Sequence, residues 1–416
     1  MWEDMMDMGE CPVNNRYQGL YLPDDEECRR CGQCVSHCPT FRVLPIDAET
    51  PRQRLRSLNK ILVEQQTLTE AEQNHLDHCL QCRVCETVCP SQVAYGVLYD
   101  AAQAKQQPFR KVSLLERLAF ALIASKAHRR ALLPWLALYQ STGLSKWLRG
   151  GALLRRWGLE QAERLSRSPA LWDMQRVYAV KIRQRRGRVA LFTGCLAEHF
   201  DRATLLAAIK VLNAIGYEVV VPPGQGCCGA IHQHNGRSAQ QLILNNLSVF
   251  YSLEVEAVLY CASGCGAQLA DYPVVDDAGQ WFHQALQDVV SFIVEHWPEH
   301  MPVASSNLKV AVHEPCSQRN VLKNQAAVYA LLAKIPGLNV TALADNAQCC
   351  GSGGSYMLRQ PQIANQLRAA KWQAISVSGA DWVVSSNFGC SFYLNAEQPD
   401  EVVPVLHPLQ LLAERL

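Results

Sequence analysis

The chain has 416 residues, which is enough for two or three domains, and 49% of them are hydrophobic while 19% are charged. This balance is typical of a globular protein with a sizeable core and excludes extensive disorder. Basic and acidic residues number 39 and 38, and the net charge of +1 argues against nucleic acid as the main partner. The unusual number is the 18 cysteines.

The expected compartment follows from the first residues and from the lengths of the apolar runs. Met1–Glu10 is acidic and lacks the apolar core of a signal peptide. Every apolar run is shorter than the roughly 18 residues needed to cross a bilayer. We therefore expect a cytoplasmic protein, either free or peripheral on the inner face of the cell membrane. In such a reducing compartment, cysteines more often bind metal or do redox chemistry than form disulfides.

The cysteines divide the chain into zones. Eight lie between Cys28 and Cys89, nine lie between Cys195 and Cys390, and Cys11 stands alone as an expected free thiol. We predict a multi-domain fold of the α+β and α/β classes. Its parts are a helical cysteine-rich domain over 1–110, a basic helical segment with a linker over 111–188, and two α/β domains over 189–305 and 306–416.

The first zone is expected to consist of helices that join two cysteine loops. Leu55, Leu58 and Ile61 recur at helical spacing. Thr69 followed by Glu72 matches a capping box, which predicts a helix that begins there and runs towards the second cysteine loop. The 40 residues between the two loops are therefore expected to be helical.

Two copies of the pattern C-x2-C-x2-C-x3-C-P are present, at Cys28, Cys31, Cys34, Cys38 and Pro39, and at Cys79, Cys82, Cys85, Cys89 and Pro90. Three thiolates at this spacing can wrap three corners of a cubane, while the fourth points away and ligates the other cluster. We therefore assign one [4Fe–4S] cluster to Cys28, Cys31, Cys34 and Cys89, and a second to Cys79, Cys82, Cys85 and Cys38. Gly32 is expected to let backbone N–H groups approach the sulfurs.

Structural zinc is the alternative for these eight cysteines. Zinc sites usually take two separated C-x2-C pairs, and a triplet repeated with the same trailing Cys-Pro does not suit one tetrahedron. Iron–sulfur clusters are therefore the preferred interpretation.

The middle zone, from Val112 to Trp157, is apolar and basic, with Glu116 as its single acid. Its basic residues and tryptophans are Arg117, Lys126, Arg129, Arg130, Lys146, Arg149, Arg155 and Arg156, and Trp135, Trp147 and Trp157. Two interpretations stay open: helices that pack on the other domains with solvated charges, or a surface for anionic lipid or a membrane partner. The second predicts that neutralising Arg129, Arg130, Arg155 and Arg156 lowers membrane binding.

From Val189 onward the chain contains an internal repeat of alternating strands and helices, which predicts two α/β units. The expected strands lie at 188–195, 217–224 and 257–265 in the first copy, and at 309–316, 339–345 and 381–390 in the second. A Cys-Cys-Gly turn follows the second strand of each copy. The matching cysteines are Cys195, Cys227, Cys228 and Cys265, and Cys316, Cys349, Cys350 and Cys390.

The Cys-Cys-Gly turns suggest metal chemistry, because adjacent cysteine side chains diverge and reach two metal atoms more naturally than one. Gly229 and Gly351 would allow the sharp turn. With these cysteines on strand ends and loops, the two copies are expected to gather their thiols at a shared interface. His232 and His234 are interpreted as loop residues in preference to ligands or proton carriers, and Cys261 as a buried strand residue.

The repeat resembles the CCG (cysteine-rich) domain of heterodisulfide reductase subunits, and the first zone resembles the α-helical ferredoxin domains of respiratory iron–sulfur subunits. With the PRQR stretch (Pro51–Arg54) and the HLDHCLQCRVCETVCPS stretch (75–91), most of the chain closely resembles the glycolate oxidase iron–sulfur subunit family. The resemblance implies a helical ferredoxin domain with two [4Fe–4S] clusters and two repeated CCG domains. It also implies an FAD-containing 2-hydroxy-acid dehydrogenase subunit as the partner that donates electrons.

The CCG cysteines depart from the broader pattern of that domain. Cys261 and Cys265 are spaced more widely than the usual pair, and Ser386 stands where the second copy would match Cys261. An H-x-P-C pattern remains from His313 to Cys316, followed by Ser317. Three alternatives therefore stay open for these cysteines: a third iron–sulfur centre, a zinc, or a metal-free thiol fold.

The expected function follows from what the clusters lack. They move single electrons, so another group, usually a flavin, must take the hydride from an organic substrate. The chain has no strand–G-x-G-x-x-G–helix fingerprint, no P-loop and no C-x-x-C-H haem motif. We interpret it as the electron-transfer subunit of a flavin-dependent 2-hydroxy-acid dehydrogenase of the glycolate or D-lactate type. It is not expected to be catalytic alone, and its acceptor is expected to be a quinone or another respiratory carrier.

Other interpretations are a heterodisulfide-reductase-like subunit, the iron–sulfur subunit of anaerobic glycerol-3-phosphate dehydrogenase, and a zinc-stabilised interaction protein.

Overall fold

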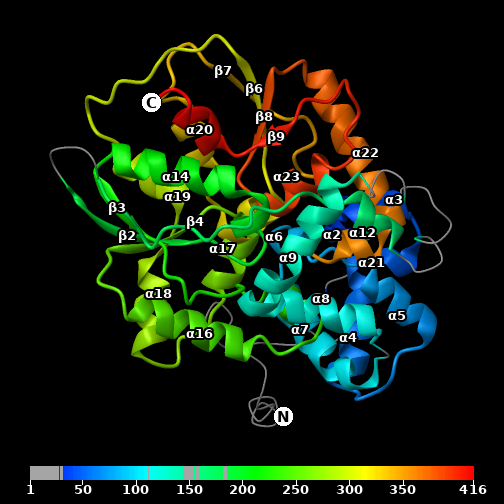
Figure 1. Ribbon diagram of the computed structural model, residues 1–416. Helices are drawn as coiled ribbons and strands as arrows, with labels where there is room; N and C mark the ends of the chain where they lie inside the picture. The colour runs from blue at the N-terminus through cyan, green and yellow to red at the C-terminus, as the bar shows by residue number, and fades with distance from the viewer. Residues whose placement is uncertain are drawn as a thin grey trace.

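The computed structural model describes residues 28, 31–110, 112–143, 148, 154, 159–180 and 185–416. Figure 1 shows N-terminal helices in blue and cyan beside two units that each contain a sheet, drawn from green to red. The predicted mixture of helical and α/β structure with two repeated units is confirmed, because the described residues form two sheets of mostly parallel strands. The residue boundaries proposed between the domains stay a prediction.

The N-terminal helices are short and surround the two cysteine loops. They are α2 (Gln33–His37), α3 (Pro39–Val43), α4 (Pro51–Leu62), α5 (Glu70–Asp77), α6 (Val84–Thr87) and α7 (Tyr95–Gln106), with 3-10 turns at Asp47–Glu49 and Gln107–Phe109. The expected helix around Leu58 is α4, whose apolar side packs against Leu98 of α7. The expected capping box begins α5: the Thr69 hydroxyl accepts from the Glu72 N–H, and the Glu72 carboxylate accepts from the Thr69 N–H at 3.0 Å.

The basic middle segment forms the helices α8 (Leu114–Ala124), α9 (Lys126–Ser141) and α12 (Glu160–Arg164), and the linker after them contributes strand β1 (Val177–Tyr178). Helix α12 lies against the second α/β unit, where the Arg164 guanidinium lies 3.6 Å from the Glu397 carboxylate. Helices α8 and α9 pack on the first unit. The Phe120 ring meets the His232 ring edge-on, and the Lys126 ammonium lies 3.0 Å from the Glu198 carboxylate. Cys11, Trp147, Trp157, Lys146, Arg149, Arg155 and Arg156 lie outside the described residues.

The first α/β unit has the strand order β1-β3-β2-β4-β5, in which only β1 is antiparallel to its neighbour. Its strands are β1 (Val177–Tyr178), β2 (Gly187–Phe192), β3 (Tyr217–Val220), β4 (Ala257–Tyr260) and β5 (Leu286–Asp288). Its helices are α13 (Ala197–Phe200), α14 (Arg202–Ala214), α15 (Ala230–Gln233), α16 (Gln240–Tyr251), α17 (Ser263–Ala270), α18 (Asp277–Ala285) and α19 (Val289–Glu295). The central strands are almost wholly buried, as expected for a parallel sheet covered on both faces.

The second unit repeats this plan with the order β7-β6-β8-β9, all parallel. Its strands are β6 (Lys309–His313), β7 (Asn339–Ala342), β8 (Trp382–Ser385) and β9 (Val405–Leu406). Its helices are the π-helix η4 (Ser317–Leu322), α20 (Ala326–Leu332), α21 (Tyr356–Arg359), α22 (Pro361–Ser378), α23 (Phe388–Leu394) and α24 (Pro408–Ala413). The order β7-β6-β8 matches β3-β2-β4, so the internal repeat predicted from the sequence is confirmed.

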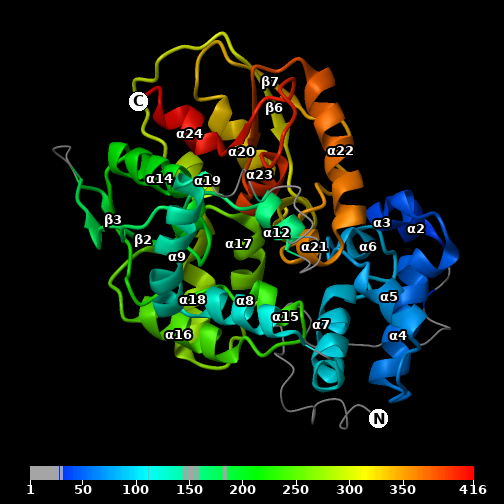
Figure 2. The same cartoon turned by 45° about the vertical axis from the view of Figure 1, so that its right-hand side comes forward.

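One apolar core joins the two units. It includes Val189 and Leu205 of the first unit with Val310 and Leu409 of the second. The C-terminal helix α24 lies beside α14, where the Lys210 ammonium donates to the Ala413 carbonyl at 2.6 Å (Figure 2). In each unit the cysteines follow the carboxyl ends of the parallel strands, which is where α/β sheets usually bind ligands. No described helix is both long and apolar enough to span a membrane.

Candidate metal centres

The first set of thiols lies near the surface, at the N-terminal turn of α2. Burial, followed by the neighbouring sulfurs of Cys28, Cys89 and Cys31, raises the pKa of Cys34 to about 11. Cys31 is exposed. Gly32 between the cysteines is left-handed, with φ 75°. The structure thus brings Cys89, from the second motif, to three cysteines of the first.

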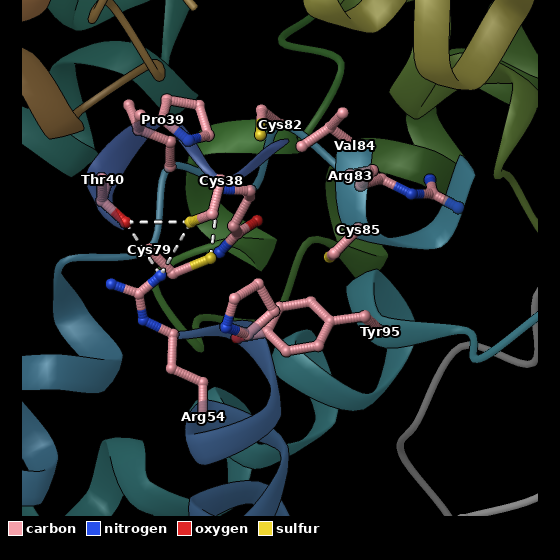
Figure 3. A pocket seen from close by; sticks show the side chains of 13 residues that line it. Cys38, Pro39, Thr40, Arg54, Cys79, Cys82, Arg83, Val84, Cys85 and Tyr95 are labelled. Carbon is pink, nitrogen blue, oxygen red and sulfur yellow. Dashed lines mark hydrogen bonds between the residues drawn. The ribbon is translucent and has the colours of Figure 1, made fainter. Parts of the chain in front are cut away.

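The second set of thiols consists of Cys38, which is buried, and of Cys79, Cys82 and Cys85, which are half-buried. Burial is the first cause that raises the pKa of Cys85, and the sulfurs of Cys82, Cys79 and Cys38 follow. All four line a pocket with Arg54 and Tyr95 (Figure 3). The crossed grouping therefore holds in space for both sets, with Cys38 and Cys89 exchanged between motifs. Ligation of a cluster by each set stays a prediction.

The two cysteine loops share an unusual backbone conformation that turns the chain around each set. Gly32 follows Cys31, and Arg83 follows Cys82 at the matching position with φ 57°. A left-handed arginine is strained, and such strain gathers at functional sites. The Arg83 side chain is held by Glu86 at 2.8 Å and by Asp271 of the first α/β unit at 3.1 Å. This second loop is thereby fixed to the rest of the molecule.

The first CCG set is a series of neighbouring thiols. Cys195 lies close enough to Cys227, Cys227 to Cys228, and Cys228 to Cys265 for the second thiol of each pair to raise the pKa of the first. Gly229 makes the predicted turn with φ 93°, and its N–H donates to the Cys227 sulfur at 3.4 Å. These sulfurs therefore lie close enough to share a metal centre.

The second CCG set has the same series of thiols and an additional imidazole. Cys349 lies close enough to Cys316 and Cys350 for these thiols to shift its pKa, and the Cys350 sulfur donates to that of Cys390 at 3.0 Å. The thiols of Cys316 and Cys350 lower the pKa of Cys349 well below its usual value. The donor atoms of His313, Cys350 and Cys390 all lie within 4.8 Å of one another. In the first unit, Phe192 stands where the second has His313.

One expectation about the CCG cysteines needs correction. Cys265 lies in α17 and Cys390 in α23, so these two are on helices and not on strand ends or loops. The gathering of both sets at a shared interface stays a prediction. The units meet at residues beside the thiols: the Ser263 and Ser317 hydroxyls lie 2.8 Å apart, and the Gly264 N–H donates to the Asn387 side chain at 3.1 Å.

A buried cation lies next to each CCG set. Arg129 is only 1% exposed, and its positive charge favours a thiolate at Cys195. Its Nε and Nη2 atoms have no hydrogen-bond partner among the described residues. It was expected to be a solvated or lipid-facing residue of the basic segment, and this expectation is wrong. Lys371 is 2% exposed and close enough to Cys349, Cys350 and Cys390 for their charges to raise its pKa, although burial lowers it overall.

These cations test whether the thiol sets fit a metal. A charge buried without a counter-charge costs several kcal/mol. Neutral thiols would leave Arg129 without that counter-charge, whereas thiolates bound to metal would supply it. Lys371 also lies near Asp345, whose charge raises its pKa more than those of the cysteines do. The donor sets and their surroundings therefore fit an anionic metal centre.

The second CCG set lies directly beside the second ferredoxin set. The charge on Cys349 raises the pKa of Cys82, after the larger effect of burial. The Asn320 side chain of η4 donates to the Cys82 carbonyl at 2.7 Å, and Leu80 packs in one core with Cys349. Three thiol sets are thus arranged in sequence: the first ferredoxin set, the second ferredoxin set and the second CCG set.

The remaining candidates are structural. The pKa of His232 is lowered, mainly by burial. His234 bonds to Asp100 of α7 at 3.1 Å. Cys261 is buried, as predicted, but it lies directly after β4 and not in the strand.

Comparison with known families agrees with this architecture. A model of the 4Fe-4S dicluster domain matches residues 24–93, and a model of the cysteine-rich domain matches residues 189–270 and 310–395. The chain is therefore an iron–sulfur protein that combines a dicluster ferredoxin domain with two cysteine-rich domains.

Comparison with individual proteins identifies the family within this class. The probable glycolate oxidase iron-sulfur subunit of Bacillus subtilis is 32% identical, over 87% of this chain and 86% of the relative. The glycolate oxidase iron-sulfur subunit of Escherichia coli is 30% identical, over 88% and 89%. Lactate utilization protein A of Bacillus velezensis is 28% identical over 55% of this chain and 100% of its own length. The chain belongs to the glycolate oxidase iron–sulfur subunit family.

Proposed function

We propose that this chain is the electron-transfer subunit of a flavin-dependent dehydrogenase for a 2-hydroxy acid such as glycolate or D-lactate. The observation that carries the proposal is the crossed pair of thiol sets, in which Cys89 joins Cys28, Cys31 and Cys34, and Cys38 joins the other motif. Two [4Fe–4S] clusters bound there would supply one-electron transfer. The names of the relatives support glycolate or lactate as the substrate class.

The direction of electron flow is proposed from exposure. Cys31 is exposed while Cys38 is buried, so the first set is the nearer of the two to a partner surface. The FAD-containing subunit would dock at the first set, and electrons would pass inward to the second set, which contains Cys82. From there they would leave towards a quinone or another respiratory acceptor.

We further propose that the second CCG set holds a third iron–sulfur centre. Its series of thiols extends beyond the three donors that meet around His313, which suits a centre of several metal atoms better than one tetrahedral zinc. It also lies against Cys82, where a redox centre could accept an electron. The adjacent buried Lys371 would offset its negative charge.

The experiment is anaerobic purification of the full chain carrying an affinity tag, followed by metal analysis and EPR spectroscopy. We expect iron and sulfide in excess of two cubanes, and an FAD protein that co-purifies. Glycolate or D-lactate should reduce the centres only when that protein is present. A colourless preparation with zinc in place of iron would contradict the whole proposal. Iron for two cubanes alone would contradict only the third centre. Disulfide reduction by the isolated chain would favour the heterodisulfide-reductase alternative.

A further inference from the structure

A network of buried charges lies under the second ferredoxin set, and it joins two stretches that the ligand assignment does not use. Arg54 ends the PRQR stretch on α4, and His75 and His78 precede Cys79 in the second cysteine stretch. Glu49, from the turn before α4, lies between them. Arg54 is 2% exposed and Glu49 is fully buried. Burying such charges is costly, so their position calls for a physical reason.

Arg54 spreads its guanidinium over the thiol set. Its Nη1 atom donates to the Thr40 hydroxyl at 2.9 Å and lies 3.6 Å from the Cys38 sulfur, in hydrogen-bonding range (Figure 3). Its Nε atom donates to the His75 carbonyl at 2.7 Å. The Thr40 hydroxyl itself lies 3.3 Å from the Cys38 sulfur. Arg54 is therefore fixed in place with its charge directed at a sulfur atom.

Glu49 opposes this charge from the far side. One carboxylate oxygen pairs with Arg54, and the other lies 2.7 Å from His75 Nδ1 and 2.6 Å from His78 Nδ1. Burial lowers the pKa of Arg54, but Cys79, Cys38, Tyr95 and Glu49 together outweigh it and raise the pKa overall. The guanidinium thus interacts with negative charge on two sides, from the sulfurs and from Glu49.

These opposed charges have a redox consequence. Reducing a cluster adds one negative charge to it, and the potential of a cluster depends on hydrogen bonds to its sulfurs and on nearby charge. A buried cation at the sulfur stabilises the reduced state, and a buried anion behind that cation weakens the effect. Such effects are larger in a buried site than in water.

We propose that Arg54 and Glu49 set the reduction potential of the cluster held by Cys79, Cys82, Cys85 and Cys38, with Arg54 raising it and Glu49 lowering it. The inference rests on the proposed function, because it needs a cluster at that set. The step concerned is the uptake of one electron from an external reductant, in which no bond forms or breaks. Arg54 and Glu49 are positioning residues for electron transfer and not ligands.

The test is an EPR-monitored redox titration of the full, anaerobically purified chain with dithionite and mediators. Arg54→Gln should lower the midpoint potential of the second cluster by at least about 59 mV, a tenfold change in the one-electron equilibrium constant. Glu49→Gln should raise it. Arg54→Lys keeps the charge and should fall between the wild type and Arg54→Gln. The matched control is Arg52→Gln on the same helix, whose exposed side chain pairs with Asp47 at 3.1 Å and should leave the potential unchanged.

The opposite signs separate this role from a purely structural one, because a loosened pocket would move both variants in the same direction or release the cluster from both. Unchanged potentials, or shifts of equal sign, would overturn the inference while leaving the clusters and the proposed function intact. If Arg54→Gln does not retain its cluster, Arg54→Lys and Glu49→Gln decide the question by the same signs. A wild-type chain without any cluster signal would overturn both the inference and the proposed function.

Discussion

At the scale of single residues, the glycines of the Cys-Cys-Gly turns show how backbone freedom shapes a thiol site. Gly351 has φ 87°, and a Cβ atom there would lie 2.5 Å from the Ala364 carbonyl oxygen. Gly32 has φ 75° but has open space where its Cβ would be. Both positions need the left-handed conformation, and only Gly351 also needs the absence of a side chain.

We therefore expect Gly351→Ala to destabilise the protein by about 2–4 kcal/mol, since it combines a left-handed alanine with an overpacked contact. Gly32→Ala should cost only about 1–2 kcal/mol, because the conformational penalty is its sole contribution. Anaerobic urea unfolding followed by circular dichroism measures both. Equal costs would contradict the role of the Ala364 contact.

Arg129 provides a second test at this scale, of whether the first CCG set is anionic. If Cys195 and its neighbours hold metal as thiolates, Arg129→Met removes the buried counter-charge and should cost about 3–5 kcal/mol. If the set is a metal-free group of neutral thiols, the same change should be neutral or stabilising. Lys371→Met applies the same test to the second CCG set. The free energy of unfolding and the metal content, both measured without oxygen, distinguish the two outcomes.

At the scale of elements, the sequence predicted well where apolar periodicity was strong. The strands around Val189 and Val310 were placed correctly, because buried parallel strands are short apolar runs. The α17 and α23 helices were missed. Their sequences, SGCGAQLA and FGCSFYL, contain glycine and cysteine next to a strand and give little helical pattern.

The candidate site likewise has features that the sequence predicted and features that it did not. Motif spacing predicted which ferredoxin cysteines come together, because three thiolates at this spacing can wrap three corners of one cubane and the fourth ligates the other cluster. The burial of Arg129, Arg54 and Glu49 could not be predicted, since charged residues are expected at the surface unless paired. Their partners come from other elements, so only the folded chain reveals them.

The capping residue of α19 predicts a pH dependence of stability. Asp288 caps Val290 and Ser291 at 3.0 Å with one carboxylate oxygen, while its other oxygen has no partner among the described residues. Burial raises the pKa of Asp288 from 3.8 to about 6. A carboxyl with a raised pKa favours folding when protonated, so its contribution is complete below pH 3.8 and is lost as the pH rises through about 6.

Asp288→Asn should therefore gain about 2–3 kcal/mol relative to the wild type between pH 4 and pH 8, because an amide keeps the cap and cannot ionise. Urea unfolding at a series of pH values measures this difference. Asp276→Asn, at the exposed cap of α18, is the control for the loss of a capping carboxylate. If the free energy of unfolding of the variant changes with pH in parallel with that of the wild type across this range, the raised pKa of Asp288 is contradicted.

At the scale of the whole molecule, the three thiol sets follow one another from the exposed ferredoxin loop into the second α/β unit. Two contacts fix the second ferredoxin set to both α/β units. Arg83 pairs with Asp271 of the first unit, and Asn320 of the second unit donates to the Cys82 carbonyl. A rigid arrangement suits electron transfer, because the distances between centres do not depend on domain motion. Helices α8 and α9 of the basic middle segment pack on the first unit, while Leu165, directly after α12, packs in one core with Leu80 and Cys349.

The exposed face of α9 tests whether that segment binds a membrane. Leu132, Trp135 and Leu138 recur every three residues and are 52%, 69% and 53% exposed, with Arg130 exposed beside them. An apolar stripe with tryptophan and basic neighbours is typical of interfacial helices. The full chain should therefore co-sediment with vesicles that contain anionic phosphatidylglycerol at low salt, and less with phosphatidylcholine alone.

Replacing all three apolar residues by serine should reduce this binding at least tenfold, because each side chain buried in the interface contributes about 1.5–3 kcal/mol. Arg130→Gln should have a smaller effect, of about 1 kcal/mol. Arg129 should not be part of such a test, since it is buried. Val377→Ser on α22, at a side chain 79% exposed, is the matched control and should bind like the wild type. Full binding by the triple variant would show that α9 does not face lipid.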